Sequence, residues 1–535
     1  MPRARSMHKW LTGPAGVLAI VVGLGISPLD AQEARQHHPT EPLAVTAPLP
    51  EPRSTRHTLE LLNRTLHFTA TVGAIPIRGA GGTILADVAY TAYTLDATRS
   101  PQRPLTFAFN GGPGAASTWL HLGTMGPWRV PLDAATIAAG TKAPIEPNND
   151  TWLDFTDLVF LDPPGTGYSR IWPHGAEAAR QEGAQERSEK GGRAWFWSIR
   201  GDIATFAEVI KTWTRQADRL ENPIVLVGES YGGFRAPLIA ETLLRDHAMA
   251  VRSLVLVSPV LDFDGRRGGH LPMHSVALLP SLAATRLERT GMEPNRATLA
   301  GVETYARGDY LLDLVRGPRD VAAQARLAEA VAGFTGLLPE QVRAQSGRVS
   351  GPSFVRGNPL FGNSAVSLYD AGMSELPAPP AGRRSGTADP FTSGLSAPLS
   401  AAVARLHARF GWTTERPYLT LASEVTQNWV WQRGPNPPEA LSALQTLMQS
   451  DQRRTTLVTH GFTDLVTPYF ASAVQLDLLP SHGRLPRIHL EVYPGGHMFY
   501  SRDASRARFR ADAERTITSA IQPNPAHPGP HRETP

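Results

Sequence analysis

Residues 223–233 read Pro-Ile-Val-Leu-Val-Gly-Glu-Ser-Tyr-Gly-Gly. A short apolar run ends in a serine bracketed by glycines, Ser230, and a helix-like stretch begins near Gly233. Between a strand and a helix, the pattern Gly-x-Ser-x-Gly holds the serine on a tight turn and lifts its hydroxyl above the sheet edge. The chain has 48 glycines, so the motif alone carries little weight. Its position between strand and helix makes Ser230 the candidate nucleophile.

A glycine-rich loop precedes this serine by about 120 residues. Residues 110–114 read Asn-Gly-Gly-Pro-Gly and follow the strand-like residues 105–109. In the strand–turn–helix context, one oxyanion donor is the amide after the nucleophile, here that of Tyr231, and a second amide comes from an earlier glycine-rich loop. The sequence therefore predicts an oxyanion hole between this loop and Tyr231.

A general base and an orienting acid follow in the order required. His497 comes directly after the strand-like residues 487–493, and Asp464 follows the strand-like residues 455–460. The chain order serine, aspartate, histidine is the α/β-hydrolase order. Asp262 also follows a strand-like run and stays open as an alternative acid.

These motifs resemble those of serine carboxypeptidases, a family of the α/β-hydrolase superfamily. The matching segments are residues 110–114, 158–169, 228–233, 461–464 and 495–497. The most specific element is Glu229, since general esterases and lipases usually carry another residue before the nucleophile.

The resemblance implies a role for each matching position. It implies a catalytic triad of Ser230, Asp464 and His497, oxyanion donors at Gly112 and Tyr231, and a binding site for the substrate carboxylate at Asn110, Gly111 and Glu229. A glutamate can bind a carboxylate only when it is protonated and donates its O–H. Burial beside an incoming negative charge raises a carboxyl pKa and favours that form. We therefore expect peptidase activity to fall as Glu229 ionises.

The chain departs from the family pattern at several positions. Members often carry a second glutamate after the glycine-rich loop, which shares a proton with the one before the serine; Thr124 stands there in this chain. Arg235, after the nucleophile turn, is predicted to be a solvated helix residue, with contact to a substrate carboxylate as the alternative.

The N-terminus predicts export. A basic segment, residues 2–9, precedes an apolar run over residues 10–26, and small residues near Ala31 suggest cleavage at Ala31–Gln32. An uncleaved anchor is the alternative, although glycines and a proline interrupt the run. The chain has no cysteine and so no disulfide framework. This favours a bacterial-type exported member, periplasmic or extracellular, without a membrane span after cleavage.

Composition excludes other classes of function. Lys and Arg number 52 against 48 Asp and Glu, and no basic block with interleaved aromatics points to nucleic acid. His-Glu-x-x-His, paired Cys-x-x-Cys and nucleotide-binding glycine loops do not occur, so we expect neither metal nor cofactor.

Alternating strand-like and helix-like segments predict an α/β-hydrolase fold, with a mostly parallel central sheet flanked by helices. Strand-like runs cover residues 66–72, 83–95, 105–109, 158–162, 224–227 and 254–258, and two more follow residue 454. The predicted parts are a signal peptide (1–31), a Pro-rich linker (32–58), a first core part (59–268), a largely helical cap insertion (269–451), a second core part (452–521) and a disordered tail (522–535). Within the insertion we expect helices over residues 296–314, 321–332 and 339–344, and a loop over residues 351–398. Residues 175–193 carry mixed charge and are expected to be a surface loop.

The predicted activity is that of a serine-type carboxypeptidase, which removes C-terminal residues from peptides with a free carboxylate through an acyl-enzyme on Ser230. The same triad could instead serve an acyltransferase or esterase. A non-catalytic binding protein on this scaffold is a third reading. The sequence assigns no oligomeric state.

Overall fold

The computed structural model describes residues 48–79, 81–96, 100–173, 193–263, 271–362, 365–373, 389–431, 436–481 and 487–522. The predicted signal peptide, most of the Pro-rich linker, residues 175–192 of the charged stretch and the tail after residue 522 lie outside the described residues.

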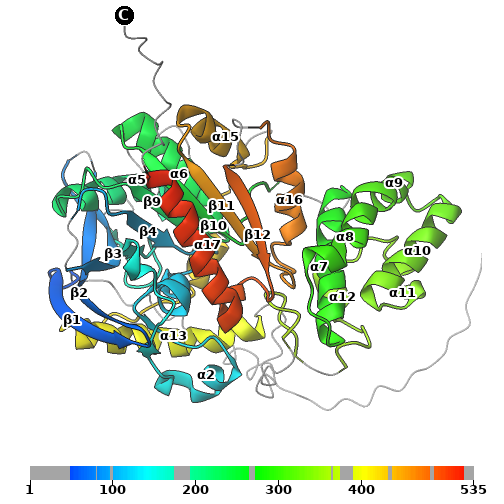
Figure 1. Cartoon of the computed structure of the whole chain (residues 1–535), viewed down its shortest axis with the longest axis horizontal. Coiled ribbons are helices and arrows are strands. Elements are labelled where there is room, and N and C mark those ends of the chain that lie inside the picture. Colours follow the sequence, from blue (N-terminus) through cyan, green and yellow to red (C-terminus); the bar gives the residue numbers. More distant parts are fainter. Residues whose placement is uncertain are drawn as a thin grey trace, which may run out of the picture. The chain divides into compact units, whose positions relative to one another are not determined.

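A central sheet, most of whose strands are labelled in Figure 1, runs in the order β1-β2-β3-β7-β4-β9-β10-β11-β12. A further short strand, β8, pairs with β3 off this path. Its strands are β1 Arg53–Leu61, β2 Arg64–Arg78, β3 Ile84–Leu95, β4 Leu105–Phe109, β7 Asp157–Leu161, β8 Arg170–Ile171, β9 Ile224–Glu229, β10 Val251–Val257, β11 Thr455–Gly461 and β12 Ile488–Tyr493. Pairing is antiparallel from β1 to β7 and parallel from β7 to β12. The mostly parallel sheet is thus confirmed.

The central strands are buried on both faces because helices cover each side. Every residue of β4 and β9 is buried. On one face Val225 and Val227 pack in a core with α13 (Pro390–Arg409) and α17 (Asp503–Ile521); Figure 1 shows α17 lying over the sheet. On the other face Leu226 packs with α5 (Ile199–Gln216) and α6 (Tyr231–His247). Successive side chains of a central strand point to opposite faces of the sheet, and both faces are covered by helices. The central strands therefore appear in the sequence as continuous apolar runs.

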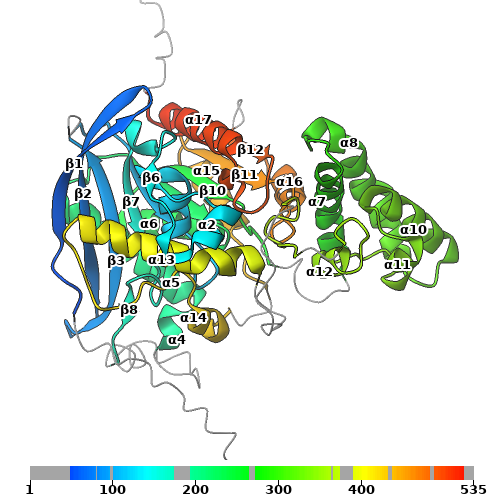
Figure 2. The ribbon, with the colours of Figure 1, turned by 90° about the horizontal axis from the view of Figure 1, so that it is seen from below.

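The predicted insertion divides into two structural parts. A helical lobe, residues 273–355, contains α7 Met273–Arg289, α8 Arg296–Tyr305, α9 Leu311–Arg316, α10 Val321–Thr335, α11 Pro339–Ala344 and α12 Gly351–Val355. It shares a hydrophobic core with α16 (Tyr469–Asp477), and Figures 1 and 2 both show α7 beside α16. By contrast, α13 and α15 (Leu441–Ser450) pack against the sheet itself. Within the described part of the insertion, the lobe thus packs beside α16, whereas α13 and α15 belong to the layers on the sheet.

The expectation of a loop over residues 351–398 is wrong at both ends, where α12 and the start of α13 lie. Proline misleads here because it fits the first turn of a helix, where its missing N–H is not needed. Pro390 occupies that position, and Asp389 caps the helix by accepting from the amides of Phe391 and Thr392.

Strand β1 begins at Arg53, inside the segment predicted to be a linker. It pairs along its length with β2, so that Arg53 lies opposite Val72 and Leu61 opposite Arg64. Its polar residues alternate with a few apolar ones, a weaker pattern than the apolar runs of the central strands.

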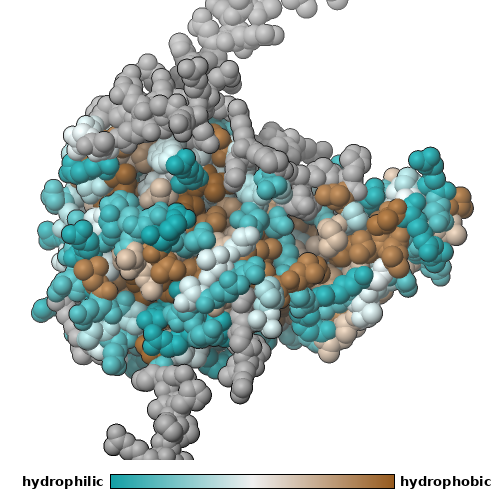
Figure 3. Space-filling model, turned by 90° about the horizontal axis from the view of Figure 1, so that it is seen from above, coloured by the Kyte–Doolittle hydropathy of each residue, from teal (hydrophilic) through white to brown (hydrophobic). Residues whose placement is uncertain are grey.

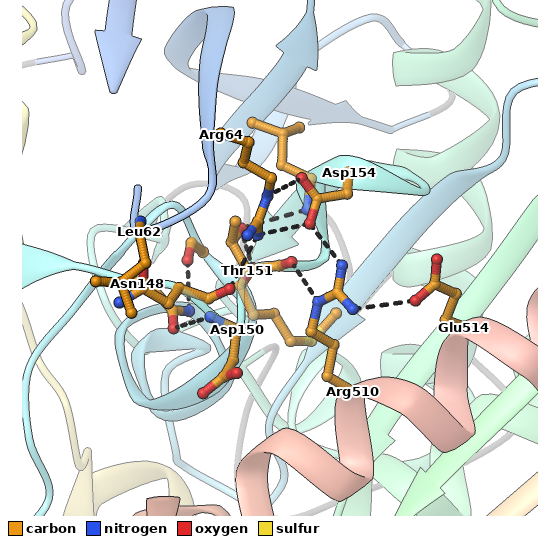
Figure 4. A network of polar contacts seen from close by, with 12 residues as sticks. Leu62, Arg64, Asn148, Asp150, Thr151, Asp154, Arg510 and Glu514 are labelled. Carbon is orange, nitrogen blue, oxygen red and sulfur yellow. Dashed lines mark hydrogen bonds and ion pairs between the residues drawn. The ribbon is translucent and has the colours of Figure 1, made fainter. Parts of the chain in front are cut away.

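An arginine network ties this hairpin to the end of the chain (Figure 4). Asp154 accepts from Arg64 Nε at 2.8 Å, and from Arg510 of α17 at 2.5 Å. Arg510 also donates to the carbonyl of Thr151. The network joins β2 to α17, segments more than 400 residues apart.

The remaining elements are short. Besides short 3₁₀- and π-helical turns, they are α1 Thr118–Leu120, β5 Trp128–Arg129, α2 Ala134–Ala139, β6 Glu146–Pro147, α4 Arg193–Phe196 and α14 Ser423–Asn428. Within the described ranges, no helix has the length and apolar character needed to cross a membrane. Apolar atoms do reach the surface of the helical lobe (Figure 3), where Leu312, Val315 and Val321 are exposed.

Candidate active site

Ser230 lies on the sharp turn that joins β9 to α6. Its backbone takes φ 62° and ψ −120°, a conformation that L-residues seldom adopt. The amide of Ser230 donates to the carbonyl of Val257 at 2.8 Å, which fixes the turn to the neighbouring strand. This is the strained turn that presents a nucleophile at the top of an α/β sheet.

The flanking glycines are required by close backbone contacts. A Cβ on Gly228 would lie 2.0 Å from the carbonyl oxygen of Gly232, and one on Gly232 would lie 2.7 Å from that of Phe109. Neither position has room for a side chain. The Gly-x-Ser-x-Gly pattern is therefore a packing requirement of the turn.

His497 lies in the loop after β12 and contacts an aspartate from the loop after β11. Its Nδ1 is 2.7 Å from Asp464 Oδ2, and both side chains are buried. Thr467 also contacts both groups: its hydroxyl donates to Asp464 at 2.5 Å and lies 2.9 Å from His497 Nδ1. Of the two candidate acids, Asp464 is the one that contacts His497 Nδ1, while the backbone of Asp262 forms a β-bridge with Glu439.

Asp464 is held in its charged form. Burial alone would raise its pKa, but the charge on His497 and hydrogen bonds from His497 and Thr467 outweigh burial, and the pKa lies below its ordinary value. An ionised carboxylate at Nδ1 orients the imidazole and leaves Nε2 to act as a base.

The glycine-rich loop lies directly against the nucleophile turn. A Cβ on Gly111 would be 2.5 Å from the Tyr231 amide nitrogen. Tyr231 opens α6, where amides have no partner within the helix. The structure thus brings the predicted loop and the first turn of α6 together, as an oxyanion hole requires.

Glu229, at the end of β9, is 4% exposed and has two neutral donors around it. The hydroxyl of Tyr500 donates to Oε2 at 2.5 Å, and the Asn110 side chain also hydrogen-bonds to the carboxyl group. Burial raises the pKa of Glu229 to about 7, against the lowering effects of His497, Tyr500 and Asn110. Glu229 is therefore largely protonated in mildly acidic solution.

A small cavity of about 90 Å³ collects most of the predicted residues along its wall. The predicted residues that line it are Asn110, Gly111, Gly112, Glu229, Ser230 and His497. The other two predicted residues do not line the cavity. Asp464 contacts His497 Nδ1, and Tyr231 follows Ser230 at the start of α6. The cavity thus brings together a hydroxyl, an imidazole and a carboxyl group whose pKa is raised to about 7.

Other side chains complete this cavity and were missed by the sequence reasoning. They are Ala115, Trp119, Tyr369, Thr392, Leu421 and Met498. Tyr369, Thr392 and Leu421 come from the predicted insertion, far along the chain from the motifs, and carry no local signal. Tyr500 was also missed, although it follows His497 by only three residues.

Arg235 is buried, which makes the prediction of a solvated helix residue wrong. Its Nε donates to Asp202 at 2.7 Å and its Nη1 to the carbonyl of Asn110 at 2.8 Å. The guanidinium also lies over the ring of Phe206, 4.5 Å from its centroid. Arg235 therefore supports the glycine-rich loop from within the protein.

A second, larger cavity of about 350 Å³ lies next to the nucleophile turn. Its wall is mostly apolar and includes Val260, Ala277, Thr467 and Ala471. The amide of Val260 donates to the backbone carbonyl of Ser230 at 3.4 Å, so this wall adjoins the backbone of the nucleophile turn. In the described part of the chain, no group of three or more histidine, aspartate or glutamate side chains could hold a metal ion.

Comparison with known proteins agrees with this geometry. Residues 90–265 match the family model of serine carboxypeptidases. Serine carboxypeptidase-like 16 of Arabidopsis thaliana is 24% identical over 195 residues, 35% of this chain and 40% of that protein. The pheromone-processing carboxypeptidase KEX1 of Saccharomyces cerevisiae is 29% identical over 152 residues, 28% of this chain and 18% of that protein. The chain thus spans less than half the length of these relatives.

The fold extends over more of the chain than the sequence similarity does. The crystal structure of KEX1(delta)P, a prohormone-processing carboxypeptidase from Saccharomyces cerevisiae, matches with a TM-score of 0.53 at 15% identity, over 85% of this chain and 91% of that one. The chain has the α/β-hydrolase fold.

Proposed function

We propose that this protein is a serine-type carboxypeptidase that releases single residues from the C-terminal end of peptides. The proposal rests on one observation: Glu229, whose pKa burial raises to about 7, lines the cavity with Asn110 and is the residue directly before Ser230. Consecutive Cα atoms lie about 3.8 Å apart. Glu229 and Ser230 also line the same small cavity, so a terminal carboxylate bound at Glu229 holds the last peptide bond beside the serine.

The chemistry is acyl transfer in two steps. His497 Nε2 takes the proton of the Ser230 hydroxyl as its oxygen attacks the last peptide carbonyl, and Asp464 holds the imidazole. The amides of Gly112 and Tyr231 stabilise the oxyanion, each by about 3 kcal/mol. His497 then gives the proton to the leaving amino group, the C–N bond breaks, and water releases the shortened peptide from the ester.

The two cavities suit the two sides of the scissile bond. The small cavity holds Asn110, Gly111 and Glu229, so it receives the residue that leaves. The larger apolar cavity adjoins the Ser230 carbonyl through Val260 and receives the side chain on the acyl side. Burial of an apolar side chain there adds binding energy.

Export is part of the proposal and is supported by the sequence of residues 1–31, with cleavage at Ala31–Gln32 and a periplasmic or extracellular site of action. N-terminal sequencing of the exported protein tests it, and an intact Met1 after export contradicts it.

A pair of peptides tests the activity itself. One N-blocked peptide ends in a free carboxylate, and its partner is the C-terminal amide. We expect hydrolysis of the free acid and little of the amide, with both absent in Ser230→Ala. Hydrolysis of esters without either peptide would favour the esterase or acyltransferase, and no labelling of Ser230 by a fluorophosphonate would favour a binding protein.

A further inference from the structure

Tyr500 places its side chain beside the carboxyl group that lines the small cavity. It lies in the short helical turn Phe499–Ser501, is fully buried, and donates its hydroxyl hydrogen to Glu229 Oε2 at 2.5 Å. Its ring is held by packing: a Cβ on Gly123 would lie 2.9 Å from Tyr500 Cε2.

The neighbouring residue explains why the phenol is needed. Thr124 follows Gly123, is buried, and its hydroxyl has no hydrogen-bond partner among the described residues. It supplies nothing to Glu229 there. Among the described residues, the carboxyl group of Glu229 is thus contacted by the Tyr500 phenol and the Asn110 side chain, and not by Thr124.

A phenol differs from a carboxyl group because it stays protonated. Burial and the nearby charge of Glu229 raise the pKa of Tyr500 well above its ordinary value. Its single hydrogen is therefore always available to Glu229 Oε2, which accepts it. The proton of the neutral glutamic acid then belongs on Oε1, the oxygen that does not accept from Tyr500.

We infer that Tyr500 is a positioning residue: it turns the Glu229 carboxyl group so that the acid proton on Oε1 faces the terminal carboxylate of the peptide. The inference rests on the proposed function and adds the residue that orients its recognition site. Because a donated hydrogen bond favours the ionised carboxylate, Tyr500 also keeps the upper pH limit of peptide binding lower than it would otherwise be.

The other groups that act on Glu229 come from separate elements. His497 favours its ionised form through charge, Asp464 opposes ionisation, and Asn110 donates a hydrogen bond. None of these is changed by removing the Tyr500 hydroxyl. If the upper pH limit of peptide binding shifts when the Tyr500 hydroxyl is removed, the shift is therefore due to the phenol.

The test compares Tyr500→Phe with a matched variant, Tyr493→Phe. Tyr493 is also fully buried and also donates to a carboxylate, Asp512, at 2.6 Å, but it does not line the cavity. The substrates are an N-acyl dipeptide with a free carboxylate and p-nitrophenyl acetate, which has none. Both are followed as kcat/KM against pH.

For Tyr500→Phe we expect a loss of about tenfold in kcat/KM on the dipeptide, mainly through KM, with the ester rate within about twofold of wild type. The alkaline fall of dipeptide hydrolysis moves to higher pH. Tyr493→Phe leaves both the KM and the fall in place. An unchanged KM and pH profile in Tyr500→Phe, or an equal loss on the ester, overturns the inference.

A second substitution keeps the test open if Tyr500→Phe does not fold. Site-specific replacement of Tyr500 by 3-fluorotyrosine preserves the ring and makes the phenol a stronger donor, so the alkaline fall should move to lower pH. A fall that stays in place overturns the inference. If the wild-type protein hydrolyses the ester but never the dipeptide, both the proposed carboxypeptidase activity and the positioning role of Tyr500 are wrong. If the wild-type protein hydrolyses the dipeptide but the Tyr500 variants do not change as expected, only the positioning role is wrong.

Discussion

Arg235 and Asp202 form an ion pair enclosed in the protein, with 2.7 Å between Arg235 Nε and an Asp202 carboxylate oxygen. The same guanidinium holds the carbonyl of Asn110. The ion pair therefore connects α5 and α6 to the loop that forms one wall of the small cavity.

Removing one partner of this pair should destabilise the fold. Arg235→Leu leaves the Asp202 carboxylate buried without its counter-charge, and we expect the free energy of unfolding to fall by about 3–5 kcal/mol. Thermal and urea unfolding measure it. Arg245→Leu is the control, since it removes an exposed ion pair with Asp246 on the same helix. It should leave the midpoint of unfolding unchanged. An equal loss in the two variants would contradict a special role for Arg235.

The nucleophile can be tested without disturbing the turn. Ser230→Ala removes only the hydroxyl, and kcat should fall by about four orders of magnitude or more while the peptide still binds. Binding of an uncleaved peptide by calorimetry supplies the control. Ordinary turnover by the alanine variant would eliminate the serine mechanism.

The pH dependence of peptide hydrolysis follows from the raised pKa of Glu229. The pKa of Glu229 is raised to about 7, so the neutral, donating form prevails below that pH and is lost above it. Hydrolysis of free-acid peptides should therefore decline above about pH 7. Glu229→Gln keeps an N–H donor at every pH and should retain activity without this decline. If activity declines above pH 7 in the wild-type protein and in Glu229→Gln alike, a group other than Glu229 causes the decline.

The same shift predicts a stability effect. Glu229 binds its proton more tightly when folded than at the ordinary value of 4.5, so unfolding releases a proton between pH 4.5 and about 7. The free energy of unfolding should fall with rising pH across this window. Replacing Glu229 by glutamine should flatten that slope, as measured by urea unfolding at several pH values.

Thr467 bonds to both Asp464 and His497, and its hydroxyl should matter for turnover rather than binding. We expect Thr467→Val to lower kcat about tenfold with little change in KM, because Asp464 loses a donor that holds it in place. Thr467→Ser keeps the hydroxyl and should restore most of the rate. A rise in KM alone would place Thr467 in binding instead.

The larger cavity should govern preference on the acyl side. Ala277→Trp puts a bulky ring into its wall, and kcat/KM should fall for peptides with a large apolar penultimate residue. Peptides with glycine at that position provide the control and should be cleaved as before. Equal losses for both kinds of peptide would point to a general disturbance.

Much of the hydrolase sheet could be predicted because its strands are short apolar runs buried on both faces. The run at residues 105–109 coincides with β4, and the predicted start of β9 is Ile224. The order of serine, aspartate and histidine predicted which loops would meet, since parallel strands end at one edge.

The residues that the insertion contributes to the small cavity could not be predicted, because they reach it through contacts between segments far apart in the sequence. Thr392 and Leu421 reach the small cavity through the packing of α13 and the segment after it, not through a local motif. Arg235 was misjudged because its partner, Asp202, lies 33 residues earlier and nothing in either local sequence pairs them. Tyr500 gave no signal because its partner, Glu229, lies 271 residues earlier and nothing in the local sequence pairs them.

Mass spectrometry of a mixed peptide library, before and after incubation with the protein, tests the central claim most directly. We predict ladders that shorten one residue at a time from free C-terminal ends, with amidated peptides and the Ser230→Ala sample unchanged. Cleavage at internal bonds, or equal trimming of amidated peptides, would contradict recognition of the terminal carboxylate beside Ser230.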